Sequence, residues 1–158
     1  MIRHPIPPLY DKNSTILILG SFPSVKSRET AFFYGHPQNR FWKVLAQLFE
    51  VPVPDTIPEK KQLILTHRLA LWDVIAACDI EGSADSSIRN VVPNDLSVIL
   101  DNAPIQHIFV NGRKAESLYK KYLLPVTERE AICLPSTSPA NASWNLERLT
   151  DAWRVVLQ

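Results

Sequence analysis

The chain has 158 residues, of which 46% are apolar and 21% charged, and its formal net charge is +1. These values are typical of a soluble globular protein, so we expect a single domain over residues 1–158 with a sizeable core. They exclude a strongly basic protein that coats nucleic acid. Neither a membrane-spanning apolar run nor a signal peptide is recognisable, and we expect a cytoplasmic protein.

The first half of the chain predicts one buried strand and two helices. The lead-in contains three prolines and reads as irregular. An apolar run that ends at Gly20 is typical of a strand buried on both faces. Two later segments are predicted to form helices, the first because its apolar residues recur at helical spacing. The predicted ranges are residues 1–14 for the lead-in, 15–19 for the strand, and 39–50 and 59–67 for the helices.

The second half continues the alternation of strands and helices. We expect strands over 69–74, 105–110 and 131–134, a long polar loop over 78–94, and helices over 95–102, 113–122 and 143–157. Asn94 is placed to cap the helix that follows it. Alternating strands and helices favour parallel pairing with right-handed crossovers. The pattern therefore predicts a three-layer α/β/α sandwich around a central, mainly parallel four-stranded sheet.

Cysteine and histidine usage argues against a metal centre. Cys78 and Cys133 form no C-x-x-C pair, so we expect buried free thiols in a reduced cytoplasm. An iron–sulfur cluster would need about four thiolates. The four histidines show no paired spacing with carboxylates. No glycine-rich phosphate loop occurs either, so we expect neither a metal nor a cofactor.

Two unusual segments carry most of the chemical information. The segment 34–42 reads YGHPQNRFW, and the segment 134–141 reads LPSTSPAN. Each lies near the carboxyl end of a predicted strand, where open parallel sheets bind ligands, so we expect the two to form one site. Their aromatic rings, amides and hydroxyls suit a flat, hydrogen-bonding ligand such as a nucleobase. A serine nucleophile elbow is absent.

These segments, together with GSFPS over residues 20–24, resemble the uracil-DNA glycosylase superfamily. Within it the chain is most similar to the hypoxanthine-DNA (deoxyinosine) glycosylase branch, and next to the mismatch-specific uracil glycosylases. The resemblance extends from about Ile16 to Trp153. It implies an enzyme that cleaves the N-glycosidic bond of a flipped base and leaves an abasic site, without a cofactor. We further expect a monomer that acts on double-stranded DNA. No lysine near the motifs is evidently placed to form a Schiff base, so we expect no lyase step.

Two positions depart from better-known relatives. Phe22 stands where many relatives have a polar side chain that activates water, and Ser136 stands where some have a histidine that stabilises the leaving base. The resemblance implies that Asn39 takes over the catalysis. Its amide offers a donor and an acceptor in fixed geometry. The alternative is that Asn39 caps the following helix, and both roles can coexist.

The remaining candidates divide into a base pocket and a DNA surface. Phe22 would wall the pocket, Tyr34 would stack on the base unless it is a core residue, and His36 would donate to the base or brace its loop. Arg40 would pair with a phosphate or with an internal carboxylate. The loop at 139–141 would enter the minor groove, unless it is only a braced turn before the last helix. The full set is Phe22, Tyr34, His36 and Ser136 for the base, and Ser24, Arg40, Ser83, Ser86, Ser138, Pro139, Ala140 and Asn141 for DNA.

Three alternatives to a hypoxanthine enzyme stay open. A uracil or xanthine glycosylase would use the same scaffold. The departures at Phe22 and Ser136 also leave room for a lesion-binding module without catalysis. A small-molecule hydrolase unrelated to DNA is disfavoured, because no acid–base pair is recognisable.

Overall fold

The computed structural model describes residues 1–157, and its centre is a parallel four-stranded sheet. The strand order is β3-β2-β6-β7, and all neighbours pair in parallel. The predicted sheet is therefore confirmed. Its strands are β2 (Ile16–Gly20), β3 (Leu69–Asp73), β6 (His107–Asn111) and β7 (Ala131–Leu134).

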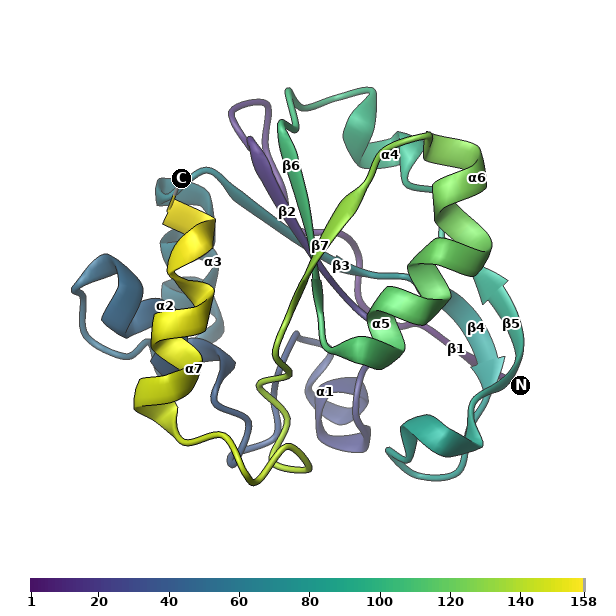
Figure 1. Ribbon diagram of the computed structural model, residues 1–158, viewed down its shortest axis with the longest axis horizontal. Coiled ribbons are helices and arrows are strands. Elements are labelled where there is room, and N and C mark those ends of the chain that lie inside the picture. Colours follow the sequence, from purple (N-terminus) through teal and green to yellow (C-terminus); the bar gives the residue numbers. More distant parts are fainter. Residues whose placement is uncertain (158) are drawn as a thin grey trace.

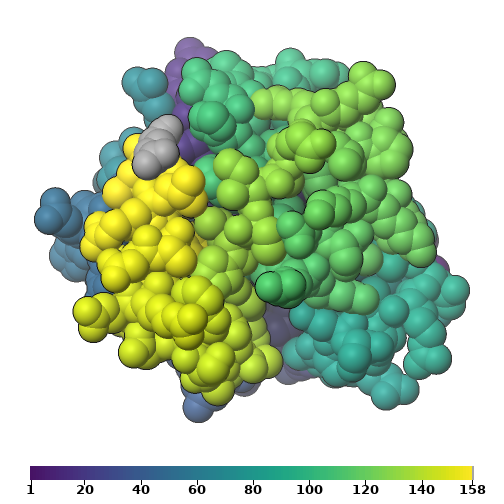
Figure 2. All heavy atoms as spheres, in the orientation of Figure 1, coloured from purple at the N-terminus to yellow at the C-terminus, as the bar shows by residue number. Residues whose placement is uncertain are grey.

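Helices cover both faces of this sheet and complete the three layers (Figure 1). One face carries α2 (Phe41–Phe49), α3 (Ile57–Thr66) and α7 (Leu146–Trp153). The opposite face carries α4 (Ser97–Leu100), α5 (Arg113–Leu118) and α6 (Leu124–Thr127). In the space-filling view, the yellow region near the C-terminus and the green region of α5 and α6 form much of the visible face (Figure 2).

Apolar side chains at the predicted spacing hold the layers together. Leu17, Ile18 and Leu19 of β2 are completely buried, as expected for the centre of a doubly covered sheet. The ring of Phe41 on α2 meets that of Trp153 on α7 edge-on, with the ring centroids 5.8 Å apart. Aromatic pairs in this geometry stabilise a core beyond the area that they bury.

A second, smaller sheet was not expected. It is antiparallel, in the order β1-β4-β5, with bounds Ile2–Arg3, Ile75–Asp79 and Arg89–Pro93. The predicted polar loop over 78–94 contains β5 and the end of β4, and the predicted irregular lead-in contains β1. Both predictions are wrong at these strands. Most β5 side chains are exposed, so the strand shows no alternation of polar and apolar residues. Its pairing rests on backbone hydrogen bonds, which leave no mark on the sequence.

Asn94 has a different function from the predicted cap. Its side-chain amide donates to the carbonyl oxygens of Asp73 (2.9 Å) and Ile75 (3.2 Å). The short α4 begins later, and the Asp95 carboxylate accepts from the Ser97 amide there. Asn94 therefore fixes the point where β3 of the large sheet passes into β4 of the small one.

Other helix boundaries shift because of local capping. The helix α1 (Val25–Thr30) was not predicted and begins at the Ser24 hydroxyl. A capping box between Thr56 and Glu59 starts α3 earlier than expected. The last helix starts at Leu146, capped by Asn145, and ends in a 3₁₀ turn over Arg154–Leu157. The helix predicted over 113–122 passes from α5 into a π turn (Tyr119–Leu123) and then α6.

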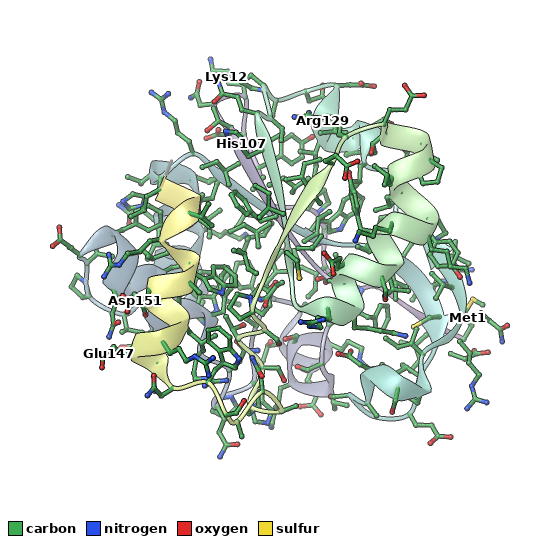
Figure 3. The ribbon with its side chains drawn as sticks, viewed as in Figure 1. Met1, Lys12, His107, Arg129, Glu147 and Asp151 are labelled. Atoms are coloured by element: carbon green, nitrogen blue, oxygen red, sulfur yellow. The ribbon has the colours of Figure 1, made fainter. Side chains whose placement is uncertain are left out.

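The loops that carry the candidate residues gather at one end of the large sheet. All four strands run toward the lower end of the view in Figure 1, where α1 lies. Lys12, His107 and Arg129 lie at the opposite end, and Glu147 and Asp151 project outward from α7 (Figure 3). No helix in the described part of the chain is long and apolar enough to span a bilayer.

Candidate active site

A hollow of about 330 Å³ opens at the carboxyl ends of the parallel strands. Both unusual segments border it, together with the loop after β2 and part of the turn before β5. The bordering residues are Gly20, Ser21, Phe22, Pro23, Ser24, Ser27, Phe33, Tyr34, His36, Asn39, Asp73, Ser83, Asp85, Asn111, Ser136, Thr137, Ser138, Pro139 and Ala140. The expected convergence of the two segments is thus observed.

A backbone hydrogen bond joins the two segments directly. The Arg40 amide donates to the Thr137 carbonyl oxygen at 3.1 Å. The Arg40 guanidinium adds donors to the carbonyl oxygens of Ser138 (2.9 Å), Asn141 (3.1 Å) and Trp144. The expected partner was a phosphate or an internal carboxylate, but the observed partners are backbone carbonyls. Arg40 therefore clamps the second segment onto the start of α2.

Asn39 uses its side-chain oxygen to start α2. Its Oδ1 accepts from the Phe41 amide at 2.9 Å and so satisfies one of the otherwise unpaired N–H donors of the first helical turn. The side chain also borders the hollow. Its Nδ2 group has no hydrogen-bond partner among residues 1–157, so its donor is available to a ligand. Asn39 lies one residue before the N-cap position, Arg40, so it supports the first helical turn without being the cap itself, and a catalytic role remains compatible with this contact.

His36 is held in a similar way. Its Nδ1 accepts from the Gln38 amide at 3.1 Å, so the loop-bracing role is observed. A neutral imidazole that accepts at one nitrogen carries its proton on the other. Because the His36 ring borders the hollow, Nε2–H is a second donor available to a ligand there.

The second segment is a rigid loop built from side-chain hydrogen bonds. Ser136 Oγ accepts from the Ser138 amide (3.1 Å), and Ser138 Oγ accepts from the Ala140 amide (3.2 Å). Asn141 donates to the Ser136 carbonyl oxygen at 3.0 Å and does not border the hollow. The loop does not run into a cap at 141, because Asn145 caps the last helix.

Asn111 braces the loop from β6, and sequence reasoning missed it. Its Nδ2 donates to Thr137 Oγ1 at 3.0 Å, and its Oδ1 accepts from the Thr137 amide at 3.1 Å. Both amide atoms are therefore engaged with one buried threonine. The available signal was an asparagine that directly follows a buried apolar strand and precedes Gly112.

Aromatic rings form the inner walls. Phe22 is buried and meets the His4 ring edge-on, with centroids 5.9 Å apart. Tyr34 stacks on Phe41 at 3.9 Å between centroids, so one face of its ring is already covered by the core. Burial and the neighbouring Asp73 raise the pKa of the Tyr34 phenol above its ordinary value, and the nearby Asn111 opposes this shift only weakly.

The serines expected on the DNA surface do not all share one environment. Ser24 borders the hollow and caps α1, and Ser83 borders it and accepts from the Val25 amide at 2.9 Å. Ser86 is exposed and lies outside the hollow. The guanidinium of Arg28 donates to the Gly82 carbonyl oxygen and so helps to hold this turn against α1.

A buried acid–histidine pair also escaped sequence reasoning. His4 Nε2 lies 2.6 Å from Asp73 Oδ2, and the two side chains are only 3% and 6% exposed. Asp73 borders the hollow, at the end of β3. In the sequence, Asp73 could have been recognised as a carboxylate at the carboxyl end of a buried strand. Nothing in the proline-rich lead-in distinguished His4.

Comparisons with known proteins agree with this geometry. Residues 7–157 match the model of the uracil DNA glycosylase superfamily. A Methanosarcina acetivorans protein named hypoxanthine DNA glycosylase is 38% identical over 100% of this chain and 99% of its own length. A protein of the same name from Methanosarcina barkeri is 32% identical over 73% of this chain and 74% of its own.

A solved structure extends the match to three dimensions. The solution NMR structure of a candidate uracil DNA glycosylase from Methanosarcina acetivorans superposes with a TM-score of 0.80, at 35% identity and with full coverage of both chains. The expected resemblance is thereby confirmed on sequence and on fold. The chain belongs to the uracil DNA glycosylase superfamily.

Proposed function

We propose that this protein is a monofunctional DNA glycosylase that hydrolyses the N-glycosidic bond of a flipped, deaminated base, foremost hypoxanthine. One observation carries the proposal: two segments about a hundred residues apart meet around a single hollow at the carboxyl ends of the sheet. Two relatives named hypoxanthine DNA glycosylase support the choice of base. The hollow of about 330 Å³ lies at the small end of ligand sites, which suits one base.

The available donors match the charge that develops as the bond breaks. Cleavage leaves negative charge on the departing base and positive charge on the sugar. Asn39 Nδ2 and His36 Nε2 are free donors at the hollow. Hypoxanthine presents acceptors at O6 and N7, so donors of this kind stabilise it as a leaving group. One such donor is typically worth about 2.7–4 kcal/mol in the transition state.

The same set of residues favours simple hydrolysis over a lyase step. Among the described residues that border the hollow there is no lysine. A Schiff base with the sugar therefore has no evident nucleophile. The product of the proposed reaction is an intact strand that contains an abasic site.

The partner proposed is double-stranded DNA, bound by a monomer in the cytoplasm. The rigid loop at Ser138–Ala140 borders the hollow and is placed to contact the strand beside an extruded base. Flipping costs a few kcal/mol and is cheapest at mispaired sites, which adds selectivity. Cys78 and Cys133 are both free thiols, which agrees with a reducing compartment.

Base release from defined duplexes tests the proposed function. Duplexes that contain inosine, uracil or xanthine are incubated with the protein and then treated with alkali, which cuts abasic sites. We expect strand cleavage only after alkali, with inosine the preferred base. Release of uracil or xanthine instead would assign the alternative substrate. Tight binding to the inosine duplex without any release would identify a lesion-binding module and contradict the proposal.

Asn39 variants separate the helix contact from the chemistry. Asn39→Asp keeps the oxygen that accepts from Phe41 but lacks the Nδ2 donor, whereas Asn39→Ala lacks both. We expect both variants to lower the single-turnover rate on inosine by at least about 10². Only Asn39→Ala should also lose about 1 kcal/mol of unfolding free energy, measured by denaturant titration. A fully active Asn39→Asp enzyme would show that the donor is not used.

The salt dependence of binding distinguishes the two uses of Arg40. Because both terminal nitrogens of its guanidinium donate to carbonyls and its Nε is buried, Arg40→Ala should weaken binding to an uncleavable inosine duplex without changing the slope of log K against log salt concentration. The exposed Lys43→Ala serves as a neighbouring control for the loss of one charge. A slope reduced by about 0.9 in Arg40→Ala would instead show a direct phosphate contact.

A further inference from the structure

Asp73 is the buried acid at the reaction pocket. Of the two aspartates that border the hollow, Asp85 is exposed and accepts from Ser21, whereas Asp73 is only 4% exposed. Its backbone is fixed on both sides, because it pairs with Gly20 of β2 and its carbonyl oxygen accepts from Asn94. The carboxylate therefore has a defined position at the end of β3.

The hydrogen bonds around His4 determine where its proton lies. His4 Nδ1 accepts from the Ile6 amide at 3.1 Å, so this nitrogen carries a lone pair. The proton of the neutral ring must then be on Nε2, which points at Asp73 Oδ2 from 2.6 Å. Asp73 accordingly acts as an acceptor at Oδ2, and the pair places a negative charge on the carboxylate.

The second oxygen of Asp73 is free on the side of Gly20. Within residues 1–157 no hydrogen bond reaches Asp73 Oδ1. Glycine has no side chain, and a Cβ atom at position 20 would lie 2.5 Å from this oxygen and 3.1 Å from the Tyr34 hydroxyl. Both oxygens are therefore close to the Gly20 backbone. The Tyr34 hydroxyl is itself buried without a hydrogen-bond partner in the described chain. Two polar groups with unused capacity thus lie together beside the hollow.

A purely structural role explains this arrangement poorly. Burying a carboxylate costs several kcal/mol, and a pair held only for stability is often replaceable by apolar residues. Here the carboxylate receives one described donor while its other oxygen stays unpaired. The neighbouring Tyr34 hydroxyl is buried without a partner in the described chain, and a reactive or ligand-binding position is one explanation for such a group. Phe22, which also borders the hollow, has no group that can accept a proton.

We propose that Asp73 is the carboxylate of the glycosylase reaction and that His4 is its positioning residue; this inference rests on the function proposed above. The C1′–N9 bond breaks with its electron pair on the base, and the carboxylate stabilises the positive charge on the sugar. The oxygen of a water molecule then bonds to C1′, and one of its protons passes to Asp73 Oδ1. That proton is finally transferred to the departed base, which regenerates the carboxylate.

Single-turnover rates on an inosine duplex test the role of Asp73. Asp73→Asn keeps the shape but removes the charge and the basic oxygen. We expect its rate to fall by at least about 10², with unchanged affinity for an uncleavable inosine duplex. The control is Asp101→Asn, at an exposed carboxylate after α4, which should keep the wild-type rate. An Asp73→Asn rate near that of the wild type would overturn the proposal.

The split between rate and affinity tests the positioning role of His4. The groups that face the carboxylate are His4 and Tyr34. His4→Phe removes the donor to Oδ2, whereas His4→Gln keeps an N–H donor. We expect His4→Phe to lower the single-turnover rate on the inosine duplex without weakening binding, and His4→Gln to recover part of that rate. Equal rates for the two variants would contradict the role, and this pair decides the question if Asp73→Asn does not fold.

The outcomes separate this inference from the proposed function. A wild-type protein that releases no base from inosine, uracil or xanthine duplexes would overturn both. An active wild type with an equally active Asp73→Asn variant would overturn only the role of Asp73. Weaker binding of Asp73→Asn with an unchanged rate at saturation would show that Asp73 reads the base, and this would also contradict the proposed chemistry.

Discussion

The site depends on the clamp between Arg40 and the loop after β7. The Arg40 amide and guanidinium together bind three backbone carbonyls of the second segment, and the guanidinium also binds that of Trp144, just beyond it. Hydrogen bonds from a charged donor are stronger than neutral ones, so this clamp fixes the loop against the start of α2. Asn111 holds the same loop from β6. The walls of the hollow are thus positioned before any DNA binds, as electrostatic catalysis requires.

Preorganisation explains why so many site residues also have structural contacts. Asn39 accepts from the first amide of α2, and His36 braces its own loop. In each case one polar atom is used by the fold and the other is left for a ligand. Asp73 follows the same pattern, with Oδ2 bound to His4 and Oδ1 free. At these positions a structural role and a role in catalysis are compatible, because the structural contact of one polar atom orients the other polar atom toward a ligand.

Sequence reasoning succeeded where burial or unusual composition left a signal. The apolar runs of β2, β3, β6 and β7 predicted the sheet, and the residue types of the two segments indicated that they would meet, as they do around the hollow. It failed where contacts cross long separations or involve only the backbone. His4 meets Asp73 across 69 positions, and β5 has mostly exposed side chains. The partners of Arg40 are carbonyls, which every residue possesses, so no pattern could have indicated them.

Amide and side-chain NMR shifts on DNA binding test the central claim that the hollow receives the extruded base. The labelled protein is titrated with an uncleavable inosine duplex, and a matched adenine duplex is the control. The account predicts inosine-specific shifts at Gly20, the Asn39 side-chain amide and the Thr137 amide, which surround the hollow. Inosine-specific shifts confined to the opposite end of the sheet, near Lys12 and His107, would contradict it.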